Sequence, residues 1–396
     1  MFENKSIIIG VSGGIAAYKT AYLVSALSKT EADVNVIMTK NACEFISPLV
    51  FETLTGNKCY VDTFDRNFKF DVEHISLAKK ADIFMIAPAT ANVIAKIANG
   101  IADDMLTTTF LASKCKKIVS PAMNTAMFEN QITQDNIAKL KKYEIGVVEP
   151  QNGLLACGDT GAGKMPEPDF LFDVIEREIA REKDMLGKKV LVTAGATMES
   201  LDPVRFLTNH SSGKMGFAIA KEAMLRGAEV TVVKANTTAE IPNFVKIVEV
   251  SSAKDMFDAV TALSDQQDII VKAAAVADYT PESYVDSKIK KKDGDLSIPL
   301  KRTMDILKYL GENKKEGQFL CGFSMETDNM LENSKAKLSK KNADMIVANN
   351  LRDAGSGFKT DTNAVTLITR DGHRSLELKS KAEVAKEIFD EILGLI

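Results

Sequence analysis

The sequence lacks long apolar runs, closely spaced cysteines and a large excess of either charge, and each absence excludes a class of protein. No run approaches the roughly 20 apolar residues that cross a membrane, and Ile7–Ile9 is too short for a secretory signal. The 5 cysteines are scattered and never form a C-x-x-C pair, so neither a disulfide framework nor a zinc site is indicated. A formal net charge of -4 gives no sign of a polyanionic partner. We therefore expect a cytoplasmic protein with no membrane or nucleic-acid partner.

The 396 residues suffice for two domains, each with its own core. In both halves, short β-branched runs alternate with helical patterns, which predicts doubly wound α/β domains with parallel sheets. The charged run Arg181–Asp184 marks the boundary between them. Before it, strands are expected at Ile7–Ile9, Val34–Met38, Ile83–Ala87, Lys117–Ser120 and Gly146–Val148, and helices at Ala16–Ser28, Thr90–Ala98 and Pro168–Ala180. The glycine-rich residues 153–166 are expected to form a mobile loop.

The second half opens with another strand that ends in glycine, Val190–Gly195. A polar loop is expected to continue to Ser212 and to lead into a helix at Gly213–Arg226. Further strands are expected at Val230–Val233, Ile269–Ala274 and Met345–Ala348, and a hairpin of Ala364–Thr369 with Leu376–Leu378 before a final helix. The second half is thus predicted to carry an antiparallel addition to its parallel sheet.

The turn after the first strand is a candidate phosphate site. Gly10, Ser12 and Gly13 precede a helical pattern, and bare N–H groups at a helix N-terminus attract phosphate. The dinucleotide fingerprint G-x-G-x-x-G, laid on Gly10, meets Ser12 and Ile15 where glycines are required. The next strand ends at Thr39 with no acidic residue to hold a ribose. The turn therefore favours a mononucleotide such as FMN over NAD.

Three residues of the first half are candidates for chemistry, each with an ordinary alternative. Cys157 lies in the glycine-rich segment, where a thiol could protonate a substrate from a flap or simply fill an apolar gap. The same segment satisfies G-x-x-x-x-G-K, but Met165 replaces the required Ser or Thr, so we exclude a P-loop. His74 is either a catalyst or a residue of an ordinary helix face. Asn124 follows a strand end and either binds a carboxylate or forms a turn.

The second half has a candidate polyphosphate site. Residues 209–216 place small polar groups before a helix, either as an anion site or with Ser212 as a helix cap. Lys288 begins a basic run, and Lys337 and Lys341 are four residues apart. Such lysines are commonly solvated, but together they could bind a triphosphate with Asp278 as a ligand for magnesium.

Taken in order, the motifs of the chain resemble those of one enzyme family. The first half resembles flavin-dependent cysteine decarboxylases in the motifs that span residues 10–19, 74–78, 87–92, 121–124 and 155–158. The second half resembles phosphopantothenate-cysteine ligase at residues 193–197, 202–205, 209–216, 273–278 and 288–291. This is the order of the bacterial bifunctional phosphopantothenoylcysteine decarboxylase/phosphopantothenate-cysteine ligases of coenzyme A biosynthesis, and the resemblance covers nearly the whole chain.

The resemblance implies two Rossmann-like α/β domains. Residues 1–182 are expected to form a flavodoxin-like, FMN-dependent decarboxylase, and residues 187–396 a CTP-dependent ligase. Trimers of the first and dimers of the second imply a homo-oligomer, a dodecamer, that takes 4'-phosphopantothenate, cysteine and CTP as its small-molecule substrates. The residues implied to bind FMN are Gly10, Ser12, Gly13, Thr39, Ala87, Pro88, Thr90 and Asn92.

The ligase reaction implied by the resemblance activates the carboxylate of 4'-phosphopantothenate as an acyl-cytidylate, from which the cysteine amine displaces CMP. Asn209 is expected to hold the acyl-cytidylate, and Lys288 to assist near the α-phosphate. Asp278 is the candidate ligand for Mg2+ (or Mn2+). The residues implied to bind CTP are Asp278, Lys288, Met304, Asp305, Ile306, Leu307, Phe323, Lys337 and Lys341.

The decarboxylation implied by the resemblance uses FMN to oxidise the thiol of the ligation product to a thioaldehyde, which accepts the electrons released with CO2. Re-reduction gives 4'-phosphopantetheine without net redox change. His74 is the expected base, Asn124 the expected clamp on the carboxylate, and Cys157 the expected proton donor.

The chain departs from the family at Phe128, Lys164 and Met304, where Trp, Arg and Pro are usual. Two other functions fit the sequence less well than the decarboxylase and ligase activities. An NAD-dependent oxidoreductase is disfavoured by the missing glycines, and a non-catalytic flavin-binding regulatory subunit by His74, Cys157 and the attached second half.

Overall fold

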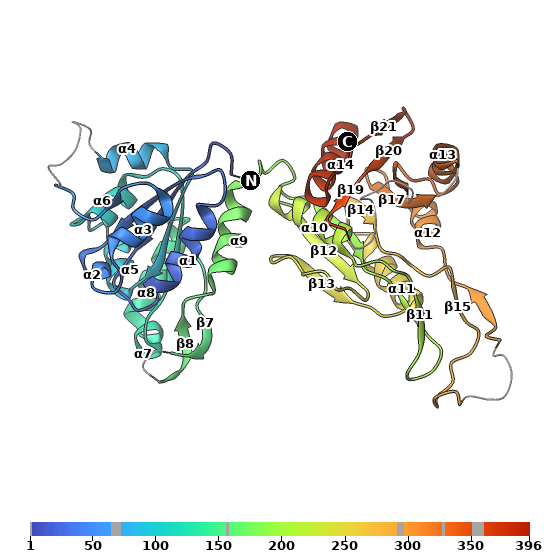
Figure 1. The fold of residues 1–396 in the computed structure, drawn as a ribbon, viewed down its shortest axis with the longest axis horizontal. Coiled ribbons are helices and arrows are strands. Elements are labelled where there is room, and N and C mark those ends of the chain that lie inside the picture. Colours follow the sequence, from blue (N-terminus) through green and yellow to red (C-terminus); the bar gives the residue numbers. More distant parts are fainter. Residues whose placement is uncertain (1, 65–72, 156–157, 291–296, 327–328, 351–359) are drawn as a thin grey trace. The chain divides into compact units, whose positions relative to one another are not determined.

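The structure, a computed structural model, describes residues 2–64, 73–155, 158–290, 297–326, 329–350 and 360–396. The chain divides into two compact units, Met1–Arg181 and Glu182–Ile396, which are drawn in Figure 1. In each unit, helices cover both faces of a central sheet (Figure 1). None of the described helices is both long enough and apolar enough to cross a bilayer.

The first unit is built on a parallel sheet of 6 strands in the order β3-β2-β1-β4-β5-β6. Its strands are β1 (Ser6–Val11), β2 (Asp33–Met38), β3 (Cys59–Tyr60), β4 (Ile83–Ala89), β5 (Lys116–Pro121) and β6 (Gly146–Val147). Its helices are α1 (Ala17–Leu27), α2 (Lys40–Cys43), α3 (Pro48–Thr55), α4 (Glu73–Lys80), α5 (Ala91–Ala98), α6 (Met105–Ala112), α7 (Thr125–Glu129), α8 (Gln131–Lys142) and α9 (Pro168–Ile179).

This strand order confirms the predicted doubly wound α/β class. The third strand lies at the edge beside β2, whereas in the flavodoxin order it lies between the first and fourth. The connections change direction between β1 and β4, which is where such sheets bind ligands. Ile7, Ile8 and Ile9 of β1 are completely buried. Helices cover both faces of a parallel sheet, so its central strands do not alternate apolar residues with solvent-exposed polar ones.

The prediction of a loop at residues 153–166 is wrong. The segment contains an antiparallel hairpin of β7 (Gln151–Leu154) and β8 (Thr160–Lys164). Its glycines permit close packing: a Cβ at Gly161 would lie 2.6 Å from Oγ1 of Thr125, and one at Gly163 would lie 2.2 Å from the carbonyl oxygen of Met123. Gly163 also has a φ of 132°, which other residues rarely adopt. Glycine here allows close contact with α7 and with the residues just before it.

The second unit repeats the strand order and extends it. Its sheet of 8 strands has the order β13-β12-β9-β14-β17-β18-β20-β21, of which the last two pairings are antiparallel. The strands are β9 (Lys189–Ala194), β12 (Glu229–Lys234), β13 (Lys246–Glu249), β14 (Ile269–Lys272), β17 (Phe319–Glu326), β18 (Met345–Asn350), β20 (Val365–Thr369) and β21 (His373–Ser375). Three small pairs lie outside the sheet: β10 (Met198–Ser200) with β11 (Phe206–Thr208), β15 (Tyr279–Pro281) with β16 (Leu300–Arg302), and β19 (Thr362–Asn363) with β22 (Lys379–Ser380). The helices are α10 (Lys214–Leu225), α11 (Ala253–Ser264), α12 (Ile306–Glu312), α13 (Met330–Lys340) and α14 (Lys381–Leu395).

Of three expectations for the second unit, the structure confirms one and corrects two. The C-terminal hairpin and final helix are confirmed, but the second strand of the hairpin, β21, is His373–Ser375 and ends before the predicted Leu376–Leu378. The polar loop before α10 is not a plain loop, since it contains the β10–β11 hairpin. The alternative that Ser212 caps α10 is wrong, because Gly213 is the N-cap residue, with a φ of 83° and no side-chain cap.

Gly311 fixes how closely α12 packs on the end of α13. A Cβ at this position would lie 1.8 Å from the carbonyl oxygen of Lys341 and 2.8 Å from its carbonyl carbon. Backbone atoms cannot move aside as a flexible side chain can, so the two helices must separate to admit any side chain.

We predict that Gly311→Ala destabilises the protein by about 1–3 kcal/mol or more, because overpacking forces a backbone shift. The control is Gly372→Ala, since a Cβ there meets nothing within 4 Å. Thermal unfolding of the full chain should show a lower midpoint for Gly311→Ala alone, and equal midpoints for the two variants would contradict the packing described.

Candidate functional site

A cavity of about 790 Å³ opens at the carboxyl edge of the first sheet. This volume falls within the range of pockets that hold small molecules and cofactors. The cavity is lined by the segments that follow β1, β2, β4 and β5, and by the β7–β8 hairpin. Five residues expected at a flavin decarboxylase site line it: Gly13, Thr39, Thr90, Asn92 and Asn124. The fold therefore gathers residues from positions 13 to 124 at one place.

The turn from β1 to α1 presents backbone donors to this cavity. The first amides of α1 are partly satisfied within the turn, since N–H of Ala17 donates to the carbonyl of Gly14. In the described part of the chain, the N–H groups of Gly13 and Ile15 have no such acceptor. Gly13 must be glycine because a Cβ there would lie 2.5 Å from Cβ of Asn41. The turn thus offers unpaired donors suited to an anion.

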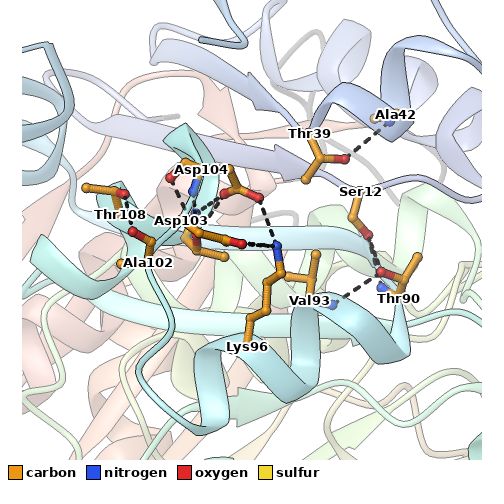
Figure 2. Close-up of polar contacts among 11 residues, drawn as sticks. Ser12, Thr39, Ala42, Thr90, Val93, Lys96, Ala102, Asp103, Asp104 and Thr108 are labelled. Atoms are coloured by element: carbon orange, nitrogen blue, oxygen red, sulfur yellow. Dashed lines mark hydrogen bonds and ion pairs between the residues drawn. The ribbon is translucent and has the colours of Figure 1, made fainter. Parts of the chain in front are cut away.

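Ser12 holds the turn against the segment after β4. It is completely buried; its hydroxyl donates to the carbonyl of Pro88 at 2.7 Å and accepts from N–H of Thr90 at 3.0 Å. Thr90 in turn caps α5 by accepting from N–H of Val93, and Thr39 caps α2 by accepting from N–H of Ala42 (Figure 2). Gly10, Ser12, Ala87 and Pro88 are not among the lining residues, so they shape the site from behind it.

An ion-pair group stabilises the cavity wall beside α5. Figure 2 shows Lys96 directed at Asp103, 2.7 Å away, and at Asp104, 3.7 Å away. The hydrogen bond between Lys96 and Asp103 raises the pKa of Lys96 and lowers the pKa of Asp103, so both stay charged. Asp104 also caps α6 through N–H of Thr107. The loop that leads to α6 is therefore tied to α5 at the wall of the cavity.

The β7–β8 hairpin closes another side of the cavity. Lys164, which stands where the family usually has Arg, lies 3.3 Å from a carboxylate oxygen of Glu167, and Lys19 of α1 lies 2.7 Å from the same oxygen. The hydrogen bond from Lys19, with that from Lys164, lowers the pKa of Glu167. Leu154 lines the cavity and is 70% exposed. The hairpin thus adds both charge and an uncovered apolar side chain to the wall.

Asn124 forms the turn that was one of its two expected roles, and it also lines the cavity. Its Oδ1 caps α7 by accepting from N–H of Ala126 at 2.9 Å, and its Nδ2 donates to Asp159 at 3.1 Å. The side chain is therefore both part of a turn and held in a fixed orientation at the cavity.

The two other expected catalytic residues of the first half are not brought to the cavity by the described structure. His74 is half-buried on α4 and is absent from the described lining residues. Cys157 lies outside the described residues, between two that are described at the hairpin, Leu155 and Gly158. Of the described thiols, burial raises the pKa of Cys59 to about 12 and that of Cys321 further, so neither is a nucleophile at neutral pH.

In the second unit, the expected nucleotide-binding residues gather where β14 and β17 end. Lys341 pairs with Asp305, the N-cap residue of α12, and Lys337 donates to the carbonyl of Phe323 at 3.1 Å. Asp278 joins the group through its backbone, because its carbonyl accepts from N–H of Thr303 at 3.0 Å. Burial opposes the charge of Asp305, but the hydrogen bonds from Lys341 and from N–H of Lys308, with the nearby charges of Lys341 and Lys272, together lower its pKa.

The remaining members of that group differ in what they can offer. Met304 is 56% exposed, whereas the side chains of Ile306 and Leu307 are buried in the core. Only the backbone of the latter two is available for a ligand. Asn209 is exposed after β11, and its Nδ2 donates to the carbonyl of Ala275 at 3.3 Å.

Lys288 lies on the excursion between β15 and β16, and a buried carboxylate anchors this excursion. Asp202, 2% exposed, accepts from N–H of Ile289 at 3.1 Å, and Arg205 donates to the carbonyl of Ile289 at 2.9 Å. Arg205 also binds Asp202 through two nitrogens, 3.0 and 2.6 Å away. Arg205, with the N–H groups of Ile289 and Val204, holds the pKa of Asp202 far below its usual range. In Figure 1, β11 and β15 project together from one edge of the second sheet.

No cluster of three or more His, Cys, Asp or Glu that could hold a metal occurs among the described residues. Within the described residues, Asp278 is therefore not part of a protein-only metal site of three or more such ligands. Mg2+ is usually bound by one or two carboxylates together with substrate phosphates and water, so a single Asp suits that mode only.

Sequence reasoning missed Lys272, and it matched Asp202 and Arg205 to a family motif without giving either a role. Lys272 ends β14 and is half-buried; burial and then the charge of Lys337 lower its pKa to about 8. A lone lysine at the end of a strand gives no signal in the sequence. Asp202 and Arg205 are three apart, a spacing that could have indicated their pairing, but the contact with Ile289 bridges 87 residues.

Comparison with known proteins agrees with both units. The family described as "Flavoprotein" matches residues 1–180, and the family described as "DNA/pantothenate metabolism flavoprotein C-terminal domain" matches residues 185–395. A crystal structure of the C-terminal domain of coenzyme A biosynthesis bifunctional protein CoaBC is 45% identical and covers 52% of this chain and 94% of that chain, with a TM-score of 0.45. A PPC decarboxylase variant complexed with pantothenoylaminoethenethiol is 30% identical and covers 43% of this chain and 96% of that chain, with a TM-score of 0.40.

Relatives match the chain from end to end. The coenzyme A biosynthesis bifunctional protein CoaBC of Bacillus subtilis (strain 168) is 46% identical, over 100% of this chain and 98% of that protein. The protein of the same name from Escherichia coli (strain K12) is 40% identical, over 98% of this chain and 97% of that protein. The resemblance read from the motifs is confirmed: the chain belongs to the family of the coenzyme A biosynthesis bifunctional protein CoaBC.

Proposed function

We propose that the second unit joins 4'-phosphopantothenate to cysteine with CTP, and that the first unit, with FMN, decarboxylates the product to 4'-phosphopantetheine. The observation that supports the proposal is convergence: Gly13, Thr39, Thr90, Asn92 and Asn124 line one cavity of the first unit, and Asp278, Asp305, Lys337 and Lys341 surround Lys272 in the second. The family's bifunctional enzyme of coenzyme A biosynthesis, with decarboxylase and ligase activities, agrees with this pairing.

The cavity of the first unit fits FMN. The turn at Gly13 offers unpaired N–H groups and lacks a Cβ, as a phosphate cradle requires. Thr39, Thr90 and Asn92 would bind polar parts of the flavin, and the apolar wall would cover its rings. When bound, FMN supplies the reversible two-electron chemistry that makes loss of CO2 possible.

The chain's own residues would orient the substrate in this cavity. Asn124 is held by its cap to α7 and by Asp159, so its amide would present a fixed donor to the substrate carboxylate. Cys157 would supply a proton and His74 would act as base, as the family resemblance implies. Since His74 does not line the described cavity, its role requires a copy of the chain or a movement to bring it there.

The proposed homo-oligomer is supported by uncovered apolar side chains around the cavity. Ile15 is 58% exposed, Tyr18 52% and Met127 50%, and all three line it. A second copy packed here would remove this apolar area from water and complete the pocket. On this basis we propose the trimer contacts of the first unit, whereas the dimer contacts of the second, which would complete a dodecamer, are proposed from the family resemblance alone.

In the ligase step, a carboxylate oxygen attacks the α-phosphate of CTP, and the bond to the β-phosphate breaks with departure of pyrophosphate. The cysteine amine then attacks the acyl carbon, and CMP leaves. Lys337, Lys341 and Lys288 would neutralise the phosphates, and Asn209 would hold the acyl-cytidylate. A divalent cation, Mg2+ or Mn2+, would reach Asp278 together with the phosphates.

Gly13→Ala is predicted to lose most of the flavin that co-purifies with the protein. The new Cβ would displace the backbone from Asn41, and overpacking of this kind should weaken flavin binding by about 10-fold or more. Gly394→Ala is the control, because a Cβ there meets nothing within 4 Å and the residue lies outside the first unit. Visible flavin absorbance per protein measures the effect. Full flavin content in Gly13→Ala would place the phosphate elsewhere.

Incubation with 4'-phosphopantothenate, cysteine and either CTP or ATP should give 4'-phosphopantetheine with CTP in the wild-type protein, as mass spectrometry of the products would show. Lys288→Gln should lower ligation at least about 100-fold while flavin stays bound. The same variant should still decarboxylate added 4'-phosphopantothenoylcysteine. Lys315→Gln, at the amino end of β17, is the control. Unchanged release of CMP from Lys288→Gln would refute its assignment, and wild-type protein that yields no product would refute the function.

Asp202→Ala is predicted to free the excursion that carries Lys288. Trypsin should cut after Lys288 or Lys290 about 10-fold faster, because cleavage follows local opening of the backbone. Asp258→Ala, which removes an exposed carboxylate paired with Lys254, should leave the rate unchanged. Equal rates in the two variants would show that Asp202 does not anchor this segment.

A further inference from the structure

Lys272 is a charged residue at the carboxyl edge of the second sheet to which the proposed function gives no task. It is the last residue of β14, opposite Thr193 of β9 and Gly322 of β17. Paired residues of parallel strands point to the same side of the sheet, and a Cβ at Gly322 would meet Leu307 of α12 at 2.7 Å. The side chain of Lys272 therefore rises on the side covered by α12 and α13.

Four charged residues face Lys272 from the elements packed on this side. They are Asp305 at the start of α12, Lys337 on α13, Lys341 at the end of α13 and Asp278 in the loop after β14. Asp305 is already paired with Lys341, and Lys337 is bonded to the carbonyl of Phe323. In the described part of the chain, Lys272 itself makes no hydrogen bond and no ion pair within 4 Å.

A half-buried ammonium without a partner is unfavourable, and two neighbouring ammonium groups make it more so. An anion with several charges would relieve all three lysines at once. The other ligand groups at this site, a cytosine base or a ribose, would gain nothing from three converging positive charges. The arrangement therefore matches the chemistry of a polyphosphate.

We propose that Lys272 contacts the triphosphate of the nucleotide substrate and holds its β- and γ-phosphates while the carboxylate attacks the α-phosphate. The proposal rests on the proposed ligase function. As the bond between the α-phosphate and its bridging oxygen breaks, the electron pair stays with pyrophosphate, and the Lys272 ammonium stabilises that charge without giving up its proton. Lys272 is thereby assigned to the leaving group, and Lys288 to the acyl end of the reaction.

Lys272→Met tests this contact in the full-length protein. Titration calorimetry at pH 7 should show CTP binding weakened by about 10-fold or more, the usual cost of a lost charge-assisted hydrogen bond. Binding of CMP should change less than about twofold, because CMP lacks the two phosphates in question. Lys315→Met, at the opposite edge of the sheet, should bind both nucleotides as the wild type does.

The pH dependence gives a second readout. The pKa of Lys272 is lowered to about 8, chiefly by burial, so its charge is lost as pH rises through that value. CTP affinity of the wild type should therefore fall between about pH 7 and 9. Lys272→Met should show no such decline because Met carries no charge. Lys272→Arg should show none because Arg stays charged throughout this range. Lys272→Arg should retain tighter binding than Lys272→Met at every pH.

Each result decides the matter. Equal affinity for CTP in the wild type and Lys272→Met overturns the proposal, and so does an equal loss for CTP and CMP, which would place Lys272 at the base or ribose. Removal of an unpaired buried charge should leave the unfolding midpoint of the free protein unchanged or higher; a lower midpoint with an unchanged ratio of CTP to CMP affinity shows a structural role instead. Wild-type protein that neither binds CTP nor releases pyrophosphate overturns the ligase function as well, whereas an active wild type with an unaffected variant overturns the role of Lys272 alone.

Discussion

Both units depend on one constraint, the change of direction that a doubly wound parallel sheet makes beside its first strand. In the first unit it falls between β1 and β4, and in the second between β9 and β14. At such a point the two loops diverge and leave a crevice that helices cannot fill. The turn at Gly13 and the lysine at the end of β14 both occupy this position. The same topology therefore serves two different ligands, and the residues that line each crevice decide which one.

The second unit has charged side chains that are buried or half-buried near its crevice. Asp202 tolerates burial because a guanidinium and several N–H groups satisfy it, and it can then anchor a long excursion. Lys272 is left without a partner in the described structure, and its ammonium is correspondingly easy to neutralise. The two residues differ in what their burial indicates. A buried ion with hydrogen-bond partners stabilises the fold, whereas one without partners is available to a ligand.

Local patterns predicted the elements well and their contacts poorly. The strand, turn and helix at residues 7–28 follow from a β-branched run and glycines, which act within a few residues. The β7–β8 hairpin was mistaken for a loop, because the need for glycine at Gly161 and Gly163 comes from Thr125 of α7 and from Met123, more than 30 residues earlier in the chain. Motif resemblance supplied the site residues that the patterns could not, yet it passed over Lys272, whose setting is made by helices beyond residue 300.

The two active sites differ in how much of the site one chain supplies. The described part of the second unit already places two aspartates and two lysines around Lys272, so its nucleotide would be held by residues of a single sheet edge. The cavity of the first unit has Asn124 in place but not His74, and its rim carries Ile15, Tyr18 and Met127 largely exposed. A site that needs a base from elsewhere and is bordered by uncovered apolar side chains is best completed by association of chains. On this reasoning the decarboxylase step would be sensitive to dilution of the protein, and activation of the nucleotide substrate far less so.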